Sequence, residues 1–263
     1  MAENISTTIA DGVGTIVLDR QKVLNALNPE MAAGLKAATA SLGADAAVRC
    51  VVIKGAGEHF MAGGDVRHFH ALLGDSPRDA EKQIGAEIED VHAAVINIRN
   101  MPKPVLASVR GASAGFGMSL VAACDLAIAA EDAVFSLAYC RIGTSPDGGS
   151  TWTLPRMVGL KRAMELALLG DRITPKQASD YGLINWVVPG SDLDKMTAEL
   201  AARLAAGPAD TLARTKALLG ASLATELESQ LEAEKASFLA GVTGAEFAEG
   251  VSAFVEKRAA RFP

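Results

Sequence analysis

Two apolar stretches of this chain are each followed at once by a run of glycine and other small residues. Residues 49–54, RCVVIK, precede FMAGGD at 60–65, and residues 105–109, VLASV, precede GASAGFG at 111–117. Short runs rich in β-branched residues and bounded by glycine predict buried strands. Each loop then leads into a segment with helical character. Strand, loop and helix in this order predict an α/β fold.

The rest of the chain extends this pattern and then changes. We expect a hairpin around Asp11-Gly12, because two β-rich runs flank this turn pair. Asn28 is a suitable N-cap and Pro29 suits the first helical position, which predicts a helix to about residue 42. Further strands are expected at 126–129, 133–136 and 185–188, and further helices at 79–99, 150–158, 160–169, 175–181, 191–206, 208–222, 226–240 and 244–260. The prediction is an α/β core with a helical C-terminal extension.

Charge and cysteine content narrow the classes of function. The formal net charge is −6 and the sequence pI about 5.3, which argues against nucleic-acid or anionic-membrane partners. The three cysteines, Cys50, Cys124 and Cys140, form no CxxC pair, so we expect a reducing compartment and no metal site. The first residues show no basic segment followed by an apolar one, and we therefore expect a cytoplasmic protein.

The two glycine-rich loops allow a functional and an ordinary interpretation. Glycine lets a backbone approach a ligand closely, and a helix N-terminus presents free amide groups. Two such turns that face one point would form an oxyanion hole. Glycine turns between strands and helices are also common without any function, so the pattern alone leaves both interpretations open.

Five segments, in the expected order, carry a family resemblance across nearly the whole chain. FMAGGD and VRGASAGFGMSLVAACDLAIA resemble the two signatures of the enoyl-CoA hydratase/isomerase (crotonase) superfamily. LDRQKVLNALN, LPRMVGLKRAMELALLGDRITPKQASDYGLINWVVP and FVEKRAARFP resemble its early, downstream and C-terminal blocks. The resemblance implies a spiral of ββα repeats followed by helices that assemble trimers or dimers of trimers. Residues 1–200 would form the spiral core for acyl-CoA binding and catalysis. Residues 201–263 would serve oligomerisation and cover the CoA pocket.

The resemblance also implies a substrate and a set of binding residues. The family binds acyl-CoA thioesters and holds the thioester oxygen, as it becomes an enolate, with two backbone amides. On this sequence those amides belong to Gly64 and Phe116. Coenzyme A is then part of the substrate, and no separate cofactor is implied. The implied CoA contacts are Lys22, Val23, Leu24, Ala62, Gly63, Asp65, Val66, Gly115 and Lys257.

This chain departs from the family pattern at the two acids of the hydratases. The positions that match the two hydratase glutamates carry Ser119 and Tyr139. Addition of water across a C=C bond needs a base for the water and a proton source for the α-carbon, and neither residue is a carboxylate. Ordinary hydration is therefore not the expected reaction.

Asp147, in YCRIGTSPDGGSTW, is the acid to which the family pattern then points. In isolation it reads as a turn or N-cap residue. Isomerases of the family carry an acid here, and one carboxylate with an oxyanion hole suffices to move a double bond. We expect Phe116, Tyr139 and Trp152 to form apolar walls that raise the pKa of Asp147 by desolvation. The leading hypothesis is an enoyl-CoA isomerase.

Three other functions stay open. One is an enoyl-CoA hydratase with a non-standard acid. A second is a hydrolytic aryl-CoA dehalogenase or thioesterase-like relative, in which Asp147 would be the nucleophile, Tyr139 its hydrogen-bond partner and His92 the base. His92 reads equally as a partly buried helix residue. The third is a CoA-binding protein without catalysis.

Residues 66–80 are expected to form a variable loop that shapes the acyl pocket. His68 and His70 lie in this segment, in DVRHFH. If they lie on a helix, their spacing directs the two rings to different faces, which disfavours a shared metal ion. We expect them to line or cover the entrance for the acyl group.

Overall fold

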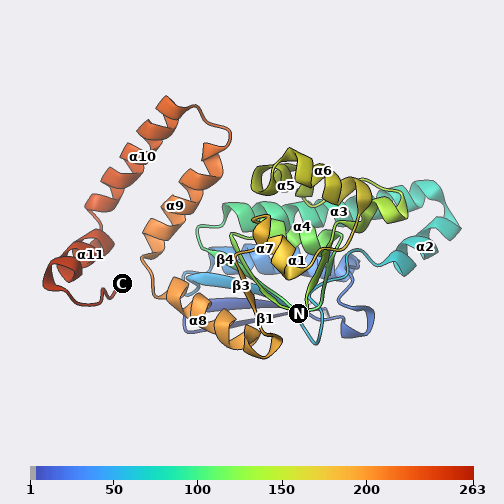
Figure 1. The fold of residues 1–263 in the computed structure, drawn as a ribbon, viewed down its shortest axis with the longest axis horizontal. Helices are drawn as coiled ribbons and strands as arrows, with labels where there is room; N and C mark the ends of the chain where they lie inside the picture. The colour runs from blue at the N-terminus through green and yellow to red at the C-terminus, as the bar shows by residue number, and fades with distance from the viewer. Residues whose placement is uncertain (1–3) are drawn as a thin grey trace.

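A six-stranded sheet forms the centre of the molecule (Figure 1). The computed structural model describes residues 4–263, and the backbone alone of residue 75. The strand order is β1-β2-β3-β4-β6-β8. Only the β1–β2 pair of this sheet is antiparallel, within the described residues. The bounds are Ile5–Ala10 for β1, Val13–Leu18 for β2, Cys50–Gly55 for β3, Val105–Val109 for β4, Leu126–Ala130 for β6 and Trp186–Val188 for β8.

The first two strands form the expected hairpin. Asp11 and Gly12 connect β1 and β2 with φ values of 50° and 76°. Two central residues with positive φ are typical of the tight turns whose twist matches paired strands. The hairpin directs β2 alongside β3 in parallel, from Val13 opposite Cys50 to Leu18 opposite Gly55.

A second, smaller sheet joins the two glycine-rich loops. Strands β5 (Ala112–Ala114) and β7 (Val134–Ser136) pair in parallel, and Met61 of the first loop bridges to Ser113 of β5. The glycine-rich pattern predicts a loop at residues 112–114, so β5 is an element that the sequence does not reveal. Its pairing fixes the first glycine loop against the second.

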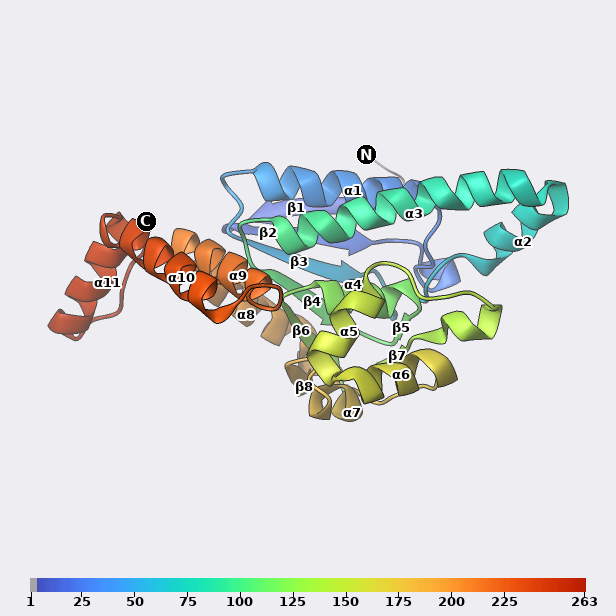
Figure 2. The same ribbon diagram turned by 90° about the horizontal axis from the view of Figure 1, so that it is seen from above.

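Helices cover the large sheet on both faces. Helices α1 (Pro29–Ala44) and α3 (Pro77–Asn100) lie side by side on one face (Figure 2). On the other face α8 (Leu193–Ala205) packs against Cys50, Val52 and Leu106. Helix α4 (Phe116–Ala123) lies inside the molecule with all eight residues buried. The remaining helices of the core are α2 (Val66–Asp75), α5 (Ser150–Val158), α6 (Leu160–Leu169) and α7 (Pro175–Asp180).

The last three helices form an extension that we call the C-terminal arm. It consists of α9 (Ala209–Ser222), α10 (Leu227–Val242) and α11 (Ala245–Glu256), and it points away from the core at the end opposite α2 (Figures 1 and 2). Ala253 is the one buried residue within these three helices. The boundary expected at residue 200 falls inside α8, which packs on the sheet. The arm begins after Ala205.

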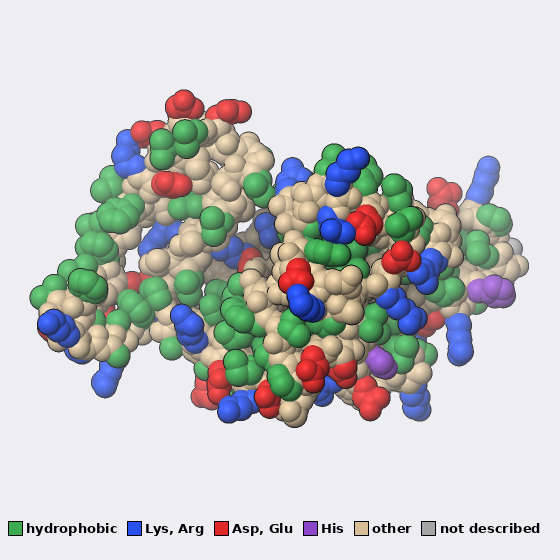
Figure 3. All heavy atoms as spheres, viewed as in Figure 1, with side chains coloured by type: hydrophobic (Ala, Val, Ile, Leu, Met, Phe, Trp, Pro, Cys, Tyr) green, Lys and Arg blue, Asp and Glu red, His purple; other side chains and the backbone are tan. Residues whose placement is uncertain are grey.

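Apolar side chains gather on the outside of the arm. Figure 3 shows hydrophobic atoms along α10 and α11. The exposed large hydrophobic residues of these two helices are Leu227, Leu231, Phe238, Leu239, Val242, Phe247, Val251, Phe254 and Val255. Within the described residues, no single helix has the length and apolar character to cross a bilayer. Helices α10 and α11, which meet at a bend of 78°, meet the length and composition criteria only when they are joined.

Candidate active site

The two glycine-rich loops meet backbone to backbone. Gly63 and Gly115 adopt φ values of 90° and 50°, which residues with a side chain rarely adopt. A Cβ atom on either glycine would lie 3.5 Å from the Cα of the other, and one on Gly63 would lie 3.1 Å from the carbonyl oxygen of Ala114. These glycines therefore let the loops approach each other closely.

Two backbone amides next to this contact have no acceptor. Gly64 follows Gly63, and Phe116 is the first residue of α4. Neither amide donates a hydrogen bond to any residue that the structure describes. Free amides at a helix N-terminus and in a glycine turn are suited to bind an oxygen that gains negative charge. The arrangement has the parts of an oxyanion hole.

The segment before α1 lies against the first glycine loop. The amide of Ala62 donates to Leu24 (3.0 Å), and the amide of Leu27 donates to Gly63 (2.7 Å). Arg20 pairs with Asp65 at 3.0 Å, and Asp65 in turn caps α2. The structure thus brings together residues 22–24 and 62–66, which the resemblance assigned to CoA from separate motifs.

Hydrogen bonds link the side chains of Ser119, Tyr139 and Asp147 in that order. The Tyr139 hydroxyl donates to Asp147 Oδ1, and Ser119 Oγ lies 3.1 Å from the same hydroxyl. Asp147 Oδ2 has no hydrogen-bond partner among the described residues. Ser119 and Tyr139 therefore support this carboxyl group.

The surroundings of Asp147 oppose its ionisation. Burial raises the pKa of Asp147 above its usual value, although the hydrogen bond from Tyr139 and the charge of His92 act in the opposite direction. Burial and the nearby Asp147 carboxylate also raise the pKa of Tyr139, which keeps its hydroxyl protonated as a donor. A carboxyl group with a raised pKa is better matched to proton transfer near neutral pH.

A cavity of about 270 Å³ connects Asp147 with the two free amides. We call it the acyl pocket. Its apolar lining includes Val66, Phe69, Ile84, Ile88 and Val91. Of the residues predicted for the site, Ala62, Gly63, Gly64, Val66, Gly115, Phe116, Tyr139 and Asp147 line it.

The other predicted site residues lie outside this lining. Leu24 accepts a hydrogen bond from the Ala62 amide, Val23 precedes it, and Lys22 is exposed. Lys257 is the C-cap of α11 in the C-terminal arm, which points away from the core (Figure 1). The side chain of His92 on α3 is exposed and does not line the pocket, although its charge acts on Asp147. The roles of Lys257 and His92 stay predictions.

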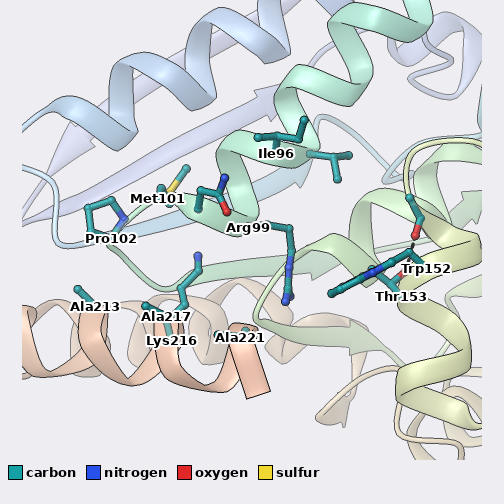
Figure 4. Close-up of a pocket in the computed structure, with 14 residues that line it drawn as sticks. Ile96, Arg99, Met101, Pro102, Trp152, Thr153, Ala213, Lys216, Ala217 and Ala221 are labelled. Carbon is teal, nitrogen blue, oxygen red and sulfur yellow. Dashed lines mark hydrogen bonds between the residues drawn. The ribbon is translucent and has the colours of Figure 1, made fainter. Parts of the chain in front are cut away.

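Trp152 does not form the wall that we expected. Its ring lies in a different cavity of about 720 Å³, between α3, α5 and α9 (Figure 4). There it stacks with Arg156 at 4.2 Å and Arg99 at 5.6 Å from ring centre to guanidinium carbon. The direction of the Trp152 side chain at the start of α5 determines which cavity the ring lines. The sequence does not show that direction. The aromatic wall near Asp147 consists of Tyr139 and Phe116, whose ring packs beside Gly148.

The segment expected as a loop is a helix, and it contacts a second carboxyl group of the pocket, which lies on α3. Residues 66–75 form α2, capped by Asp65. His68 of α2 contacts Glu87 of α3 at 2.7 Å between Nε2 and Oε1, and Glu87 lines the acyl pocket. His70 is exposed. Sequence reasoning missed Glu87, since a glutamate in the middle of a charged helix reads as a surface residue.

Comparison with known proteins agrees with this geometry. The family model of the enoyl-CoA hydratase/isomerase family matches residues 8–263. The chain is 35% identical to a 1,2-epoxyphenylacetyl-CoA isomerase of Escherichia coli, over 100% of this chain and 99% of that protein. It is 40% identical to a probable enoyl-CoA hydratase of Rhodobacter capsulatus, over 97% and 95%. A solved structure of a putative enoyl-CoA hydratase from Streptomyces coelicolor superimposes with a TM-score of 0.93 at 34% identity, covering 100% of this chain and 95% of that one.

The names of other relatives cover different reactions. They include a Delta(3,5)-Delta(2,4)-dienoyl-CoA isomerase of Arabidopsis thaliana, 32% identical over 71% of this chain, and a 4-chlorobenzoyl coenzyme A dehalogenase of an Arthrobacter species, 31% identical over 78%. The fold and the paired amides are those of an acyl-CoA enzyme of the crotonase class. Within that class, the chain belongs to the enoyl-CoA hydratase/isomerase family.

Proposed function

We propose that this enzyme is an enoyl-CoA isomerase that shifts a double bond with Asp147 as its proton-transfer group. The observation that carries the proposal is the position of the Asp147 carboxyl group. It lines the same cavity as the acceptor-free amides of Gly64 and Phe116, and it accepts a hydrogen bond from Tyr139. The proposal also uses the expectation from the family resemblance that Ser119 and Tyr139 stand where hydratases carry glutamates.

The reaction follows from these groups. Asp147 Oδ2 takes a proton from the carbon next to the thioester of a 3-enoyl-CoA. The electrons move to the thioester oxygen, where the amides of Gly64 and Phe116 stabilise the negative charge. The carboxylic acid then returns the proton to the far end of the dienolate, which leaves the double bond conjugated with the thioester. One carboxyl group serves both steps, and we propose that no separate cofactor takes part.

The rest of the binding site is proposed on the same basis. The pocket of about 270 Å³ lies just below the range of about 300–1,000 Å³ for sites that enclose whole drug-sized ligands, so it fits the acyl group alone. The CoA moiety would lie along residues 22–24 and 62–66. Lys257 would contact it from a neighbouring copy of a trimer or a dimer of trimers. The cytoplasmic location stays a prediction.

The replacement of Asp147 by Asn tests the assignment. We expect kcat for the conversion of 3-enoyl-CoA to 2-enoyl-CoA to fall about 100- to 10,000-fold, the usual contribution of a general acid–base residue. The Kd for CoA thioesters should stay within about twofold, because no CoA contact changes. Asp180→Asn, on an exposed acid of α7, is the control and should retain full activity. Full activity of Asp147→Asn would refute the assignment.

A hydrolytic aryl-CoA dehalogenase is the second candidate, and one observation favours it. Tyr139 donates to Asp147 while the charge of His92 favours the ionised carboxylate, as an attack by Asp147 on an aryl ring would require. The exposure of His92 and its absence from the pocket lining count against it. Mass spectrometry after rapid quenching with 4-chlorobenzoyl-CoA distinguishes the two. A covalent aspartyl adduct would replace the isomerase proposal.

A further inference from the structure

A contact between Glu87 and His68 faces the acyl pocket, and neither residue belongs to the groups that we propose for the chemistry. The Glu87 side chain is 8% exposed, and its Oε1 atom lies 2.7 Å from His68 Nε2. The pair connects α2 to α3, and Glu87 belongs to the pocket lining. Among the described residues, Glu87 Oε2 has no hydrogen-bond partner. One acceptor atom of a buried carboxyl group is therefore available to a ligand.

Burial of the Glu87 carboxyl group costs free energy when no hydrogen-bond donor binds its free oxygen. Apolar side chains surround it in the pocket, including Phe69, Ile84 and Ile88. Burial raises the pKa of Glu87, and the hydrogen bond and charge of His68 only partly oppose this. A pair of apolar residues would join α2 to α3 without the free-energy cost of burying a carboxyl group. A hydrocarbon acyl group would leave the free oxygen without a partner.

Glu87 and Asp147 belong to separate hydrogen-bonded pairs in the pocket. Glu87 lies on α3 and contacts His68 of α2, whereas Asp147 lies between Ile142 and α5 and accepts from Tyr139. The Glu87 carboxyl group is therefore not part of the Tyr139–Asp147 pair to which we assign the proton transfer.

We propose that the Glu87–His68 pair selects acyl groups that carry a hydroxyl group, with Glu87 Oε2 as the acceptor. The substrate class is then a hydroxylated acyl-CoA rather than a plain hydrocarbon one. The inference rests on the proposed binding of the acyl group in this pocket, but it does not depend on which reaction follows. The hydroxyl group supplies the hydrogen bond that the free oxygen lacks.

Binding without turnover tests this inference. The probes are saturated octanoyl-CoA and its 5-, 6-, 7- and 8-hydroxy derivatives, measured by isothermal titration calorimetry. A hydrogen bond to a charged group contributes about 1.5–3 kcal/mol, so at least one hydroxy derivative should bind about 10- to 100-fold more tightly than octanoyl-CoA. Equal Kd values for all five probes would overturn the proposal.

A matched set of variants separates recognition from structural support. Glu87→Met keeps the length of the side chain and removes the acceptor. It should abolish the preference for the hydroxy derivative while octanoyl-CoA binds as well as before or better. Glu89→Gln, an exposed residue of the same helix, is the control and should keep the wild-type preference. A parallel loss of both affinities in Glu87→Met would mean that the pair only supports α2, which would overturn the proposal.

One further variant separates hydroxyl recognition from a failure to fold. Glu87→Gln retains an acceptor oxygen and should keep part of the preference even if Glu87→Met folds poorly. Loss of the whole preference in Glu87→Gln, with octanoyl-CoA binding also lost, would contradict hydroxyl recognition. Because the probes carry no double bond, failure of the isomerase proposal would appear in the Asp147→Asn assay and not here.

Discussion

Helices α4 and α10 show how differently the two ends of this chain are stabilised. All eight residues of α4 are buried, and its first residue supplies one of the two free amides of the acyl pocket. None of the sixteen residues of α10 is buried, and apolar side chains such as Leu231 and Phe238 face outward. The core therefore buries most of its apolar side chains within one chain, whereas the C-terminal arm leaves many of them exposed.

We propose that the core carries out the chemistry and that the C-terminal arm forms the contacts between copies. Everything that lines the acyl pocket belongs to the core. Large exposed apolar patches often mark a contact with another protein, and α10 and α11 carry nine exposed large hydrophobic residues. The contrast agrees with the proposed trimer, in which the arms would pack against neighbouring copies.

The largest expected effect on the free energy of unfolding comes from a substitution that creates a cavity at α4. Leu120 is 0% exposed, and Leu120→Ala should lower the free energy of unfolding by about 2–5 kcal/mol, as large-to-small core substitutions do. Leu231→Ala in α10 removes the same atoms from a side chain that is 52% exposed, and it should change the value by less than about 0.5 kcal/mol. Urea unfolding of chains diluted to single copies measures both. Equal effects would remove the contrast between the helices.

The junction between the arm and the core should give the next largest effect. Lys216 of α9 donates to the carbonyl groups of Ile98 (2.7 Å) and Lys103 (3.0 Å), and it pairs with Asp125 at 2.7 Å. Lys216→Met leaves Asp125 mostly buried without its cation, which should cost about 3 kcal/mol. Adding Asp125→Asn should restore more than half of this loss in urea unfolding. A cost below about 0.5 kcal/mol would show that the core does not depend on this junction.

A change in pH dependence is expected when Tyr139 loses its hydroxyl group. The hydrogen bond from Tyr139 lowers the pKa of Asp147, so Tyr139→Phe should raise that pKa further above its usual value. Because the ionised carboxylate is the base, the acidic limb of the pH–kcat/KM profile should move to higher pH. An opposite shift or no shift would contradict the role of the hydrogen bond.

A carboxyl group of the arm provides the control for that experiment. Hydrogen bonds from Arg258 and from the Arg261 amide lower the pKa of Glu249 to about 2. Glu249 lies on α11, outside the pocket lining, so Glu249→Gln should leave the pH profile unchanged. A shifted profile in this variant would show that the arm contributes charge to the active site.

The smallest effect on the single chain is expected at the most exposed aromatic residue of the arm. Phe254 is 86% exposed, so Phe254→Ser should leave the unfolding free energy of a single copy unchanged within about 0.5 kcal/mol. The same change should weaken self-association, because it removes apolar surface that the proposed trimer would bury. Light scattering across a concentration series measures the mass. An unchanged mass profile would exclude Phe254 from the interface.

Much of the fold could be predicted because local signals and tertiary packing agree. Asn28 caps α1 and Pro29 begins it, as their residue types indicate, and α5 and α6 have the expected bounds. The crotonase fold followed from motif order across the whole chain. Strand β5 was missed because its three residues lie in a glycine-rich run, where only the pairing with β7 makes them a strand.

The site could be predicted where backbone geometry or a motif position defines it, and less well where side-chain direction does. Gly64, Phe116 and Asp147 line one pocket, as the motif positions implied. Trp152 points into another cavity. Glu87 points into the acyl pocket from α3, a helix that carries many charged residues. The periodicity of α3 does not show that α2 folds back over it, and this contact buries Glu87.

The contact between Gly63 and Gly115 holds together two kinds of groups. The backbone amides beside it do not depend on side-chain identity, whereas the nearby side chains can be exchanged. The neighbouring amides belong to the main chain, so no exchange of the Gly64 or Phe116 side chain removes the donor unless it introduces proline. The residues at 119, 139 and 147 are attached to the same scaffold but can be exchanged one at a time. Point substitutions at these three positions can therefore change the chemistry while the two amide donors of the proposed oxyanion hole stay in place.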